Sequence, residues 1–398
     1  MRESAAGLFR ETLISASKNA RVEEWEMTGA QVTPDAPDWR VRKEVLHGGR
    51  QEGVDVITLH NGRLALTLVP TRGMGLLRAQ LGDVRLGWDS PVKEVVHPHH
   101  VHLQSQGGLG WLEGFNEWLV RCGLENIGPP GADKFSTSTG SETAVELTLH
   151  GRIANLPASE VEIVVDRRPP HLLRVRGRVD ERRFGGPKLE LWTEISTRPN
   201  SSEFRVADTI TNRSSAVQEF QILYHANHGP PLLEEGAAFL APIASLAPRD
   251  SYAAQSVAEY ARYGSPSCGA AEQVFFLHPL ADTRGRTLIG LRNKAGDRAV
   301  SMAYSVKELP CLTLWKNAGA LEDGYVTGLE PGTSFPSHRS LERRHGRVPR
   351  LSPGASYHST LDIAVHTDGA AVRRVARRIA LIQGRRKPVI IRQPVTRR

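Results

Sequence analysis

Hydrophobic and polar residues alternate with a period of two along most of the chain, in short segments that end at Gly, Pro, Asn or Asp. This period predicts β-strands, because successive side chains of a strand point to opposite faces. Residues 54–70, VDVITLHNGRLALTLVP, predict a hairpin whose turn contains Asn61 and Gly62. More than ten such segments follow one another with little helical pattern between them. The chain is therefore predicted to be all-β, as an antiparallel sandwich or barrel.

Helical patterns are confined to three places: residues 3–17, the segment near residue 257 and the segment near residue 371. The expected organisation is an N-terminal helical segment at 1–24, a β-domain at 25–367, and a basic helix and tail at 368–398. The C-terminal helix is amphipathic and basic, which suits a membrane surface, an RNA contact or a solvated helix that packs through its Val and Ile side chains. We expect the last of these, with a mobile tail that is dispensable for function.

The charge of the chain changes the picture only at its C-terminal end. The net charge is +8, but nine arginines, one lysine and no acidic residue follow Asp368. The remainder carries 41 basic and 43 acidic residues, so it has no marked excess of positive charge. We therefore expect no nucleic-acid partner, and we expect a small neutral or mildly anionic ligand.

Two further features bear on the compartment in which the protein acts. No apolar run reaches the ~18 residues that a membrane helix needs, and the first residues do not have the pattern of a secretory signal. The cysteines Cys122, Cys268 and Cys311 are widely separated and form no CxxC pair. We expect reduced thiols, a cytoplasmic location and no membrane partner, with the oligomeric state left open.

Polar side chains gather where predicted strands end. In QILYHANHGP, residues 221–230, the period of two places His225 and Asn227 on one face and Tyr224 on the other. Pro230 and Pro231 then end the strand, because proline cannot donate to a sheet ladder. A histidine at this position suits a packed core, a metal site or a catalytic site.

Three other segments share this property. In LHGRIANLPA the alternation puts Thr148, His150 and Arg152 on one face with Glu146, and a histidine near an arginine could bind sugar hydroxyls. LTLWKN places Trp315 and Lys316 on opposite faces of a strand. Glu330 precedes a proline, which favours extended backbone at the end of a strand.

The order of these motifs, HGR followed by Asn, then YHxN, then LExxxxxP, resembles the galactose mutarotase-like (aldose 1-epimerase) superfamily. It is more similar still to a bacterial branch of that superfamily. The resemblance covers residues 55–367 and includes PTRGMGL, GWLEGFNEWLVRCGLENIG, LHGRIANLPA, LYHANHGPPLL and TLWKNAGALEDGYVTGLEPGTSFP.

The resemblance implies a β-supersandwich that binds a small-molecule carbohydrate in an open groove, and an isomerase that needs no cofactor. It implies that His225 and Glu330 are catalytic. The side chains that it would place around the sugar are Arg72, His150, Arg152, Asn227, Trp315 and Lys316. The chain differs from the usual pattern at 228–230, where His-Gly-Pro follows Asn227, and lacks a match for the aspartate that binds substrate in the galactose enzymes. The identity of the sugar therefore stays open.

The chemistry of the pair fits this implication. Opening a cyclic hemiacetal requires removal of the anomeric hydroxyl proton while the ring oxygen is protonated. A carboxylate and a protonated imidazole on opposite sides of the sugar do both near neutral pH, each contributing roughly 10²–10⁴-fold.

Two other functions compete with this one. HPHHVH, residues 97–102, could supply metal ligands to a sugar isomerase or lyase, but on a strand His100 and His102 would share one face while His97 and His99 share the other. One strand then offers at most two convergent ligands, so we expect no structural metal site. A non-catalytic carbohydrate-binding domain is the second alternative, and the presence of both an acid and a base disfavours it.

Overall fold

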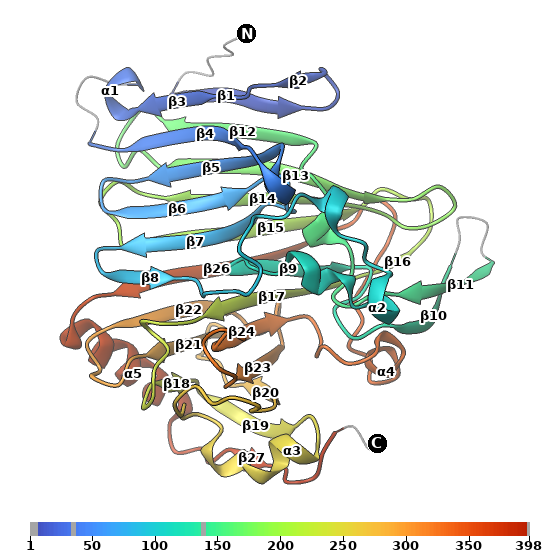
Figure 1. Ribbon diagram of the computed structural model, residues 1–398, viewed down its shortest axis with the longest axis vertical. Coiled ribbons are helices and arrows are strands. Elements are labelled where there is room, and N and C mark those ends of the chain that lie inside the picture. The colour runs from blue at the N-terminus through green and yellow to red at the C-terminus, as the bar shows by residue number, and fades with distance from the viewer. Residues whose placement is uncertain (1–6, 33–36, 137–140, 396–398) are drawn as a thin grey trace.

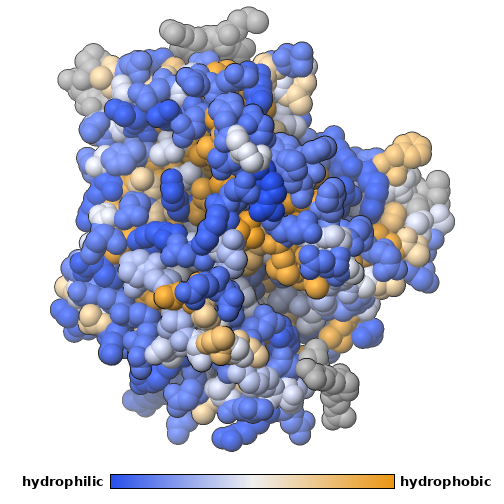
Figure 2. Space-filling model, viewed as in Figure 1, coloured by the Kyte–Doolittle hydropathy of each residue, from blue (hydrophilic) through white to orange (hydrophobic). Residues whose placement is uncertain are grey.

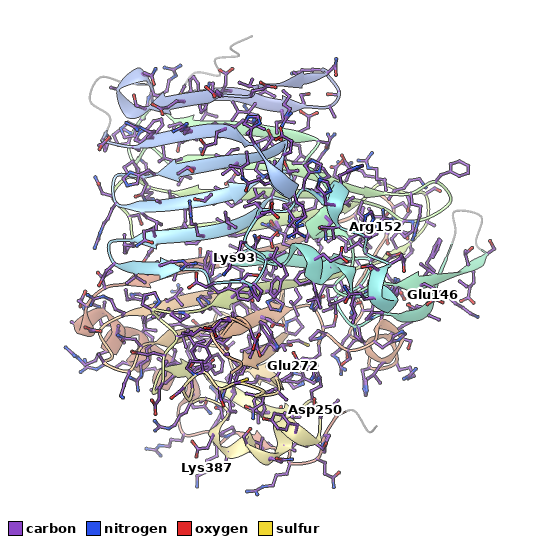
Figure 3. All side chains as sticks on the ribbon, viewed as in Figure 1. Lys93, Glu146, Arg152, Asp250, Glu272 and Lys387 are labelled. Atoms are coloured by element: carbon purple, nitrogen blue, oxygen red, sulfur yellow. The ribbon has the colours of Figure 1, made fainter. Side chains whose placement is uncertain are left out.

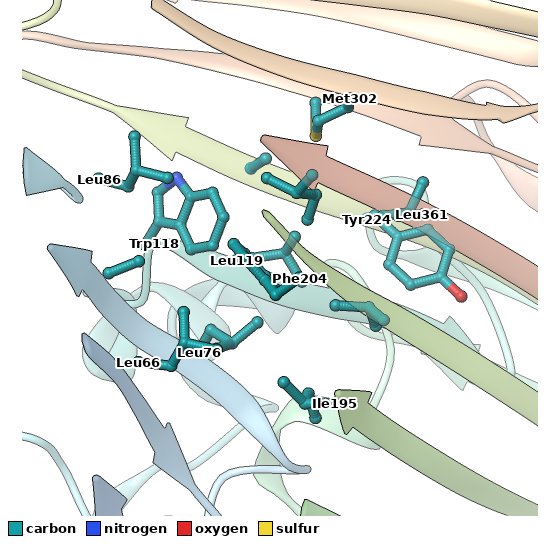
Figure 4. Packing of buried hydrophobic residues seen from close by; sticks show 14 of the residues in the cluster. Leu66, Leu76, Leu86, Trp118, Leu119, Ile195, Phe204, Tyr224, Met302 and Leu361 are labelled. Atoms are coloured by element: carbon teal, nitrogen blue, oxygen red, sulfur yellow. The ribbon is translucent and has the colours of Figure 1, made fainter. Parts of the chain in front are cut away.

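The structure is a computed structural model that describes residues 7–32, 37–136 and 141–395 (Figure 1). Two large, mostly antiparallel sheets stack face to face and enclose the main hydrophobic core. Leu66, Leu119, Phe204 and Leu361 interdigitate there between the two sheets (Figure 4). The all-β prediction is confirmed, and it takes the sandwich form.

The larger sheet has 13 strands, with β8 (Val84–Leu86) attached to β7 outside the main path. In spatial order the others are β27 (Val389–Ile390), β19 (Ile243–Pro248), β20 (Gln273–Pro279), β23 (Cys311–Asn317), β24 (Val326–Gly332), β17 (Gln221–His228), β9 (Leu119–Leu124), β7 (Gly75–Leu81), β6 (Leu64–Val69), β5 (Val54–His60), β4 (Arg40–Leu46) and β3 (Trp25–Thr28).

The smaller sheet has 10 strands. They are, in order, β18 (Ala238–Leu240), β21 (Arg286–Arg292), β22 (Ala299–Ser305), β26 (Ser356–His366), β15 (Glu203–Asn212), β14 (Lys188–Thr197), β13 (Leu173–Arg182), β12 (Glu160–Asp166), β1 (Leu8–Ser15) and β2 (Ala20–Arg21). Two short pairs lie outside these sheets: β10 (Gly131–Ser136) with β11 (Glu142–Leu147), and β16 (Gln218–Glu219) with β25 (Arg350–Leu351).

The helical segments of the described residues are mostly single turns. They are α1 (Gly29–Val32), η1 (Gly49–Gln51), η2 (Pro98–His100), α2 (Ser105–Gly108), η3 (Gly110–Gly114), η4 (Ile153–Asn155), α3 (Ser251–Gln255), η5 (Val257–Glu259), α4 (Arg339–Arg344) and the longer α5 (Gly369–Gln383). No helix in the described part of the chain is both long enough and apolar enough to cross a membrane.

Local sequence explains the strand pattern well in places. Strand β13 alternates buried and partly exposed residues along its length, as a strand with one face on the core should. The predicted hairpin at 54–70 is confirmed: β5 and β6 pair with Leu59 opposite Leu66, and Asn61 Oδ1 accepts hydrogen bonds from the backbone N–H groups of Arg63 and Leu64. Strand β17 is buried at every position, because the sheet is covered on both faces there.

The prediction of an N-terminal helix is wrong for the described residues from 7 onward, and residues 3–6 lie outside them. Leu8–Ser15 form strand β1, which pairs with β12 and places Phe9 and Leu13 in the core. A β-bulge between Thr12 and Ile14 shifts the register. The bulge breaks the period of two and leaves apolar residues at a spacing that resembles a helix. This segment therefore belongs to the sandwich.

Elements after the β-domain also attach to it. The predicted helix near residue 371 is confirmed as α5, whose Val375 and Ile379 pack against Leu288 of β21. Strand β27 then adds in parallel to the edge strand β19. Near residue 257 the helical pattern yields only the short turns α3 and η5.

A buried ion pair joins the two sheets. Arg121 of β9 donates to Asp208 of β15 through Nε at 2.5 Å and Nη2 at 3.0 Å, and both side chains are inaccessible to solvent. The Tyr224 hydroxyl of β17 donates to the same carboxylate at 2.8 Å. Burial by itself would lower the pKa of Arg121, but the charge of Asp208 and its hydrogen bonds raise this pKa above its ordinary value. The pair is thus held charged in the interior.

We predict that Arg121→Met lowers the free energy of unfolding by about 3–5 kcal/mol, because it leaves the Asp208 carboxylate buried without its partner. Urea unfolding followed by circular dichroism measures the change. The matched control is Arg205→Met, which removes a similar Arg–Asp pair with Asp362 at a position where the Arg205 side chain is 56% exposed. The control should cost less than about 1 kcal/mol. Equal losses in the two variants would contradict the prediction.

Candidate active site

His225 and Glu330 occupy directly opposite positions on neighbouring strands. In the β17–β24 ladder Leu223 pairs with Gly332 and Ala226 with Leu329, so the same register puts His225 opposite Glu330. The ladder is interrupted there, and Pro331 has no backbone N–H to donate. Imidazole Nε2 lies 3.1 Å from carboxyl Oε1. The prediction placed Glu330 at a strand end, whereas it lies inside a strand at the middle of the sheet.

A third polar residue continues this row. Thr313 of β23 pairs with Glu330, and its side chain therefore stands on the same face of the sheet. Tyr224 and Ala226, the neighbours of His225, point into the core between the sheets. The row consequently faces outward, away from the smaller sheet.

Loops cover this outward face and form a cavity of about 570 Å³. His225, Glu330 and Thr313 make its buried floor. The walls come from η3, the segments around residues 128 and 150, the start of β20, β23 and the turn that enters α4. Figure 2 shows apolar side chains gathered in a hollow near the middle of this face of the molecule. The site is therefore a deep pocket with an apolar surround.

Aromatic rings enclose the imidazole of His225. The ring centroids of Phe115, Trp315 and His150 lie 5.3, 5.3 and 5.6 Å from it. This burial, with the nearby His150, lowers the pKa of His225 well below its ordinary value. Burial also raises the pKa of Glu330 well above its ordinary value, and the charge of Glu272 adds to the effect. These shifts favour a carboxylic acid beside a neutral imidazole, whereas the sequence interpretation assumed a carboxylate and an imidazolium.

His150 lines the cavity as an acceptor rather than a donor. Its Nδ1 lies 2.7 Å from the carbonyl oxygen of Ile127, which can only accept, so Nδ1 carries the proton. Burial lowers the pKa of His150 to about 4, so the ring is neutral at neutral pH and Nε2 is an acceptor. The ring leaves the expected strand face because strand β11 ends at Leu147 and His150 has a positive φ of 58°.

Two buried polar atoms of cavity-lining side chains, Trp111 Nε1 and Thr313 Oγ1, lack a hydrogen-bond partner within the described protein, and the contact of Glu330 Oε1 is the one at 3.1 Å to His225 Nε2. Unpaired buried polar groups cost roughly 1–3 kcal/mol each, so such a cluster is unusual unless a ligand completes it. Sequence reasoning missed Trp111 and Thr313. Thr313 shares a face with Trp315 by the period of two, so the alternation of β23 could have identified it.

Glycine at position 328 makes room for the side chains of His225 and Glu330. A Cβ added there would lie 2.3 Å from Glu330 Oε1 and 3.1 Å from His225 Cε1. Any side chain at this position would displace the carboxyl group. The motif VTGLEP therefore supplies the Glu330 carboxyl group and also requires a residue without a side chain at position 328.

The rim of the cavity holds an ion pair that sequence reasoning also missed. Glu272 accepts hydrogen bonds from Trp315 Nε1 at 2.7 Å and from Arg249 Nη2 at 2.8 Å. Arg249 also donates to Asp250. Figure 3 shows Glu272 and Asp250 on the side of β19 and β20. Glu272 directly precedes β20, and no pattern in the sequence distinguishes it from a solvated loop carboxylate.

Of the residues that the resemblance placed around the sugar, His150 and Trp315 line the cavity with His225 and Glu330. Arg72 lies behind the wall instead. It is fully buried, donates to Glu117 at 2.7 Å and to Asn155 at 2.7 Å, and holds the carbonyl of Gly114 at 2.8 Å. It thereby supports the segment that carries Trp111 and Phe115.

Asn227 does not line the cavity either, and its amide donates to the carbonyls of Glu117 and His225. Lys316 points to the opposite face from Trp315, as the alternation predicted. Its ammonium group donates to the carbonyl of Arg262 at 2.6 Å and lies over the ring of Tyr263, and burial lowers its pKa to about 8. Asn227 and Lys316 therefore hydrogen-bond to the backbone around the site and hold it in place.

Arg152 lies in a separate, smaller hollow with Glu125 and Glu181. Figure 3 shows it well away from Glu272. Its expected companion on a strand face, Glu146, is exposed on β11. The expected face of Glu146, Thr148, His150 and Arg152 is therefore wrong, because the strand stops before His150.

The other histidines that the sequence singled out lie elsewhere. His228 is buried outside the cavity and accepts a hydrogen bond from Trp118 Nε1 at 3.4 Å. His97 caps the turn η2, so the strand faces proposed for residues 97–102 are wrong. Among residues 7–32, 37–136 and 141–395, no group of three or more His, Cys, Asp or Glu side chains is arranged to hold a metal ion.

The fold and the site define a galactose mutarotase-like protein. A family described as a domain of unknown function (DUF4432) matches residues 51–365, and the chain belongs to this family. No curated protein matches the chain.

Solved structures agree with this assignment. A "putative aldose 1-epimerase" from Klebsiella pneumoniae subsp. pneumoniae MGH 78578 has 41% sequence identity and a TM-score of 0.93, covering 98% of this chain and 100% of its own. A galactose mutarotase-like protein from Clostridium acetobutylicum has a TM-score of 0.56 at 13% identity, covering 82% of this chain and 98% of its own. At that identity the second likeness concerns the fold alone, and the predicted superfamily and fold are confirmed.

Burial of Glu330 gives a prediction about pH and stability. The folded protein keeps the proton that the unfolded chain loses above the ordinary pKa of 4.5, so ionisation of Glu330 favours unfolding increasingly as the pH rises from there toward its raised folded value. Glu330→Gln removes this contribution. The melting temperature of the variant relative to the natural protein should therefore rise between about pH 5 and about pH 8.

Differential scanning calorimetry over this range measures the difference. The lowered pKa of His225 acts in the opposite direction, with stability lost as the pH falls below about 6.5, but both proteins share it and it cancels to first order. Glu322→Gln, in an exposed loop, is the control and should show no such trend. A constant difference at every pH would disprove a buried neutral carboxyl group.

Proposed function

We propose that the protein is an aldose 1-epimerase-like enzyme that binds a free sugar or sugar derivative and interconverts its anomers. The observation that carries the proposal is the approach of His225 Nε2 to Glu330 Oε1, 3.1 Å apart on the floor of a cavity of about 570 Å³. The name of the Klebsiella protein, which is 41% identical, supports the same reaction class.

The two groups hold one transferable proton between them. A carboxylic acid beside a neutral imidazole contains the same number of protons as a carboxylate beside an imidazolium. Transfer across the 3.1 Å contact therefore creates the charged pair without a proton from solvent. Hydroxyl groups of a bound sugar hydrogen-bond to the pair, and these hydrogen bonds stabilise the charged form.

In the charged form, the Glu330 carboxylate removes the proton of the anomeric hydroxyl while the His225 imidazolium protonates the ring oxygen. The bond between C1 and the ring oxygen breaks, and the open-chain aldehyde forms. Rotation about C1–C2 presents the other face of the carbonyl. On reclosure His225 takes the proton from the attacking hydroxyl and Glu330 returns one to the carbonyl oxygen, which restores both groups.

Binding falls to side chains around this pair. Nε2 of His150 accepts from a sugar hydroxyl, Trp111 Nε1 donates to a sugar oxygen, and the Thr313 hydroxyl does either. Trp315 offers an aromatic wall whose orientation is fixed by Glu272. Arg72 acts through the wall that it supports.

We expect Glu330→Gln and His225→Asn to fold normally and to lose roughly 10²–10⁴-fold in turnover, because each removes one half of the proton transfer. The double variant should be scarcely worse than either single one, since the two groups act as a unit. Anomer interconversion followed by NMR, across a panel of free sugars and above the uncatalysed rate, measures the effect.

His228→Asn is the matched control: it alters the same strand three residues away, outside the cavity, and should change kcat/KM far less. The proposal fails if His225→Asn retains full activity, or if no free sugar is interconverted by the natural protein.

The steric requirement at residue 328 gives a separate test. Gly328→Ala should lower kcat by about 10²-fold, since a displacement of roughly 1 Å between reacting groups has that effect. Gly264→Ala is the control, because its added Cβ meets no atom within 4 Å. Unchanged kcat in Gly328→Ala would show that the position of the carboxyl group does not limit turnover.

A further inference from the structure

The C-terminal helix α5 presents a strongly basic side to solvent. Its apolar side, with Val375 and Ile379, packs on the smaller sheet. The basic side chains of the helix and of the segment that follows it are all exposed, and together they form the basic surface of the molecule: Arg373, Arg374, Arg377, Arg378, Arg385, Arg386, Lys387 and Arg392. Figure 3 shows Lys387 at the end of the molecule where β27 lies.

Neighbouring carboxylates do not neutralise this charge. In the part of the chain that the structure describes, no basic side chain after Asp368 forms an ion pair with an acidic one. Many arginines of the β-domain do form such pairs, as Arg176 does with Glu162 at 2.6 Å. No acidic residue follows Asp368 in the sequence. The basic surface therefore carries an excess of positive charge that solvent ions or a partner must balance.

An exposed aliphatic side chain lies among these arginines. Leu381 comes four residues after Arg377 and three after Arg378, so the three side chains are neighbours on one face of the helix. Leu381 is 80% exposed, although the apolar side of α5 is buried against the sheet. Aliphatic side chains are exposed again where the chain enters β27: Val389, Ile390 and Ile391. Cationic and aliphatic groups thus occur together at this end of the molecule.

Hydrogen bonds hold the basic surface in place. Gln383, at the end of α5, accepts from the backbone N–H of Ile243 at 2.7 Å and donates to the carbonyl of the same residue at 3.2 Å. Strand β27 then pairs in parallel with β19. Figure 1 shows α5 and β27 at the same end of the molecule. A partner that binds here meets a preformed surface, so little conformational entropy is lost on binding.

The composition of the surface distinguishes between two polyanionic partners. Single-stranded nucleic acids are bound largely by stacking of bases on aromatic rings, and the chain has no Phe, Tyr, Trp or His after Asp368. Anionic lipids attract clustered Lys and Arg side chains without a specific pairing geometry. Aliphatic side chains beside the cations enter the head-group region of a membrane, whereas they gain nothing from a phosphate backbone. The mixture of arginine and leucine therefore favours a lipid surface.

We propose that the basic surface, together with Leu381, binds the anionic head groups of a lipid membrane. The inference goes beyond the proposed function and does not depend on it. The sequence pattern favoured a solvated helix without a membrane partner, and the structure adds the unpaired arginines and the exposure of Leu381. Because Val375 and Ile379 are already buried in the protein, the attachment is mainly electrostatic and reversible.

Sedimentation of the full chain with lipid vesicles tests the proposal. Vesicles of phosphatidylcholine alone are compared with vesicles that also contain phosphatidylglycerol, at about 0.1 M and about 0.5 M salt. The protein should sediment only with the anionic vesicles, and the higher salt should release most of it, because screening weakens the attraction. A sample without vesicles accounts for aggregation, and a single-stranded RNA homopolymer is titrated in a parallel arm.

Four variants test the surface itself. Arg373→Gln/Arg377→Gln should lower the partition coefficient about 25-fold, at about fivefold for each charge. Arg373→Lys/Arg377→Lys should bind as the natural protein does, because attraction to lipid requires the charge and not the planar guanidinium group. Leu381→Asn should weaken binding about fivefold to tenfold through loss of apolar contact. Arg63→Gln/Arg168→Gln is the matched control, since it removes two exposed charges from the β5–β6 and β12–β13 turns and should bind normally.

Salt-sensitive binding to anionic vesicles that falls in the Gln variant and in Leu381→Asn, and persists in the Lys variant and the control, supports the inference. Absence of binding, equal binding to both kinds of vesicle, an equal loss in the control, a loss in the Lys variant or full binding by Leu381→Asn overturns it. Binding of the RNA without binding of vesicles also overturns it, in favour of a nucleic-acid surface. Every substituted side chain is exposed, so circular dichroism should show the same melting temperature in all variants.

Discussion

The Arg121–Asp208 ion pair joins the two sheets beneath the strands that carry His225 and Glu330. Arg121 lies on β9, and its cross-strand neighbour on β17 is Tyr224, whose hydroxyl binds the same aspartate. His225 is the next residue after Tyr224, on the opposite face. The position of the imidazole above the sheet is thus tied to a charged contact below it, at 2.5 Å. Because both side chains are inaccessible to solvent and Asp208 also accepts from Tyr224, loss of either charged partner would leave the other buried and unpaired between the sheets.

Burial then decides the chemistry of the outer face. The same aromatic and aliphatic cover that encloses the cavity raises the pKa of Glu330 and lowers that of His225. These shifts favour the neutral form of both groups, and the proposed reaction begins with proton transfer within the pair. Its unpaired polar atoms represent stability given up for ligand binding, as is common at functional sites.

Arg72 and Lys316, which resemble substrate ligands in the sequence, serve as supports in the structure. Arg72 holds the carbonyl of Gly114 from behind, and the aromatic wall of the cavity depends on it. Lys316 ties down the loop that carries Tyr263 in a similar way. The groups left facing the ligand are mostly rings, leucines and neutral polar atoms, which suits an uncharged sugar better than an anionic one.

The sequence by itself determined most of the strands and the all-β class, because a period of two is a local property of the chain, and its ordered motifs singled out His225 and Glu330 as a candidate pair. His225 and Glu330 could be named from LYHAN and GLEPG, and the opposite faces of Trp315 and Lys316 follow from the alternation alone. The β-bulge at Thr12, however, disguised a strand as a helix. The positive φ of His150 ended the alternation that had grouped it with Arg152.

Only the tertiary structure decided which polar residues meet. The register between β17, β24 and β23 aligned His225, Glu330 and Thr313 in one row, although they are far apart in the sequence. Loops brought Trp111 and Glu272 to that row, while Arg72, Arg152, Asn227 and Lys316 turned to other partners. Such contacts depend on long-range pairing and on which groups lose water, and no local pattern in the chain encodes either one.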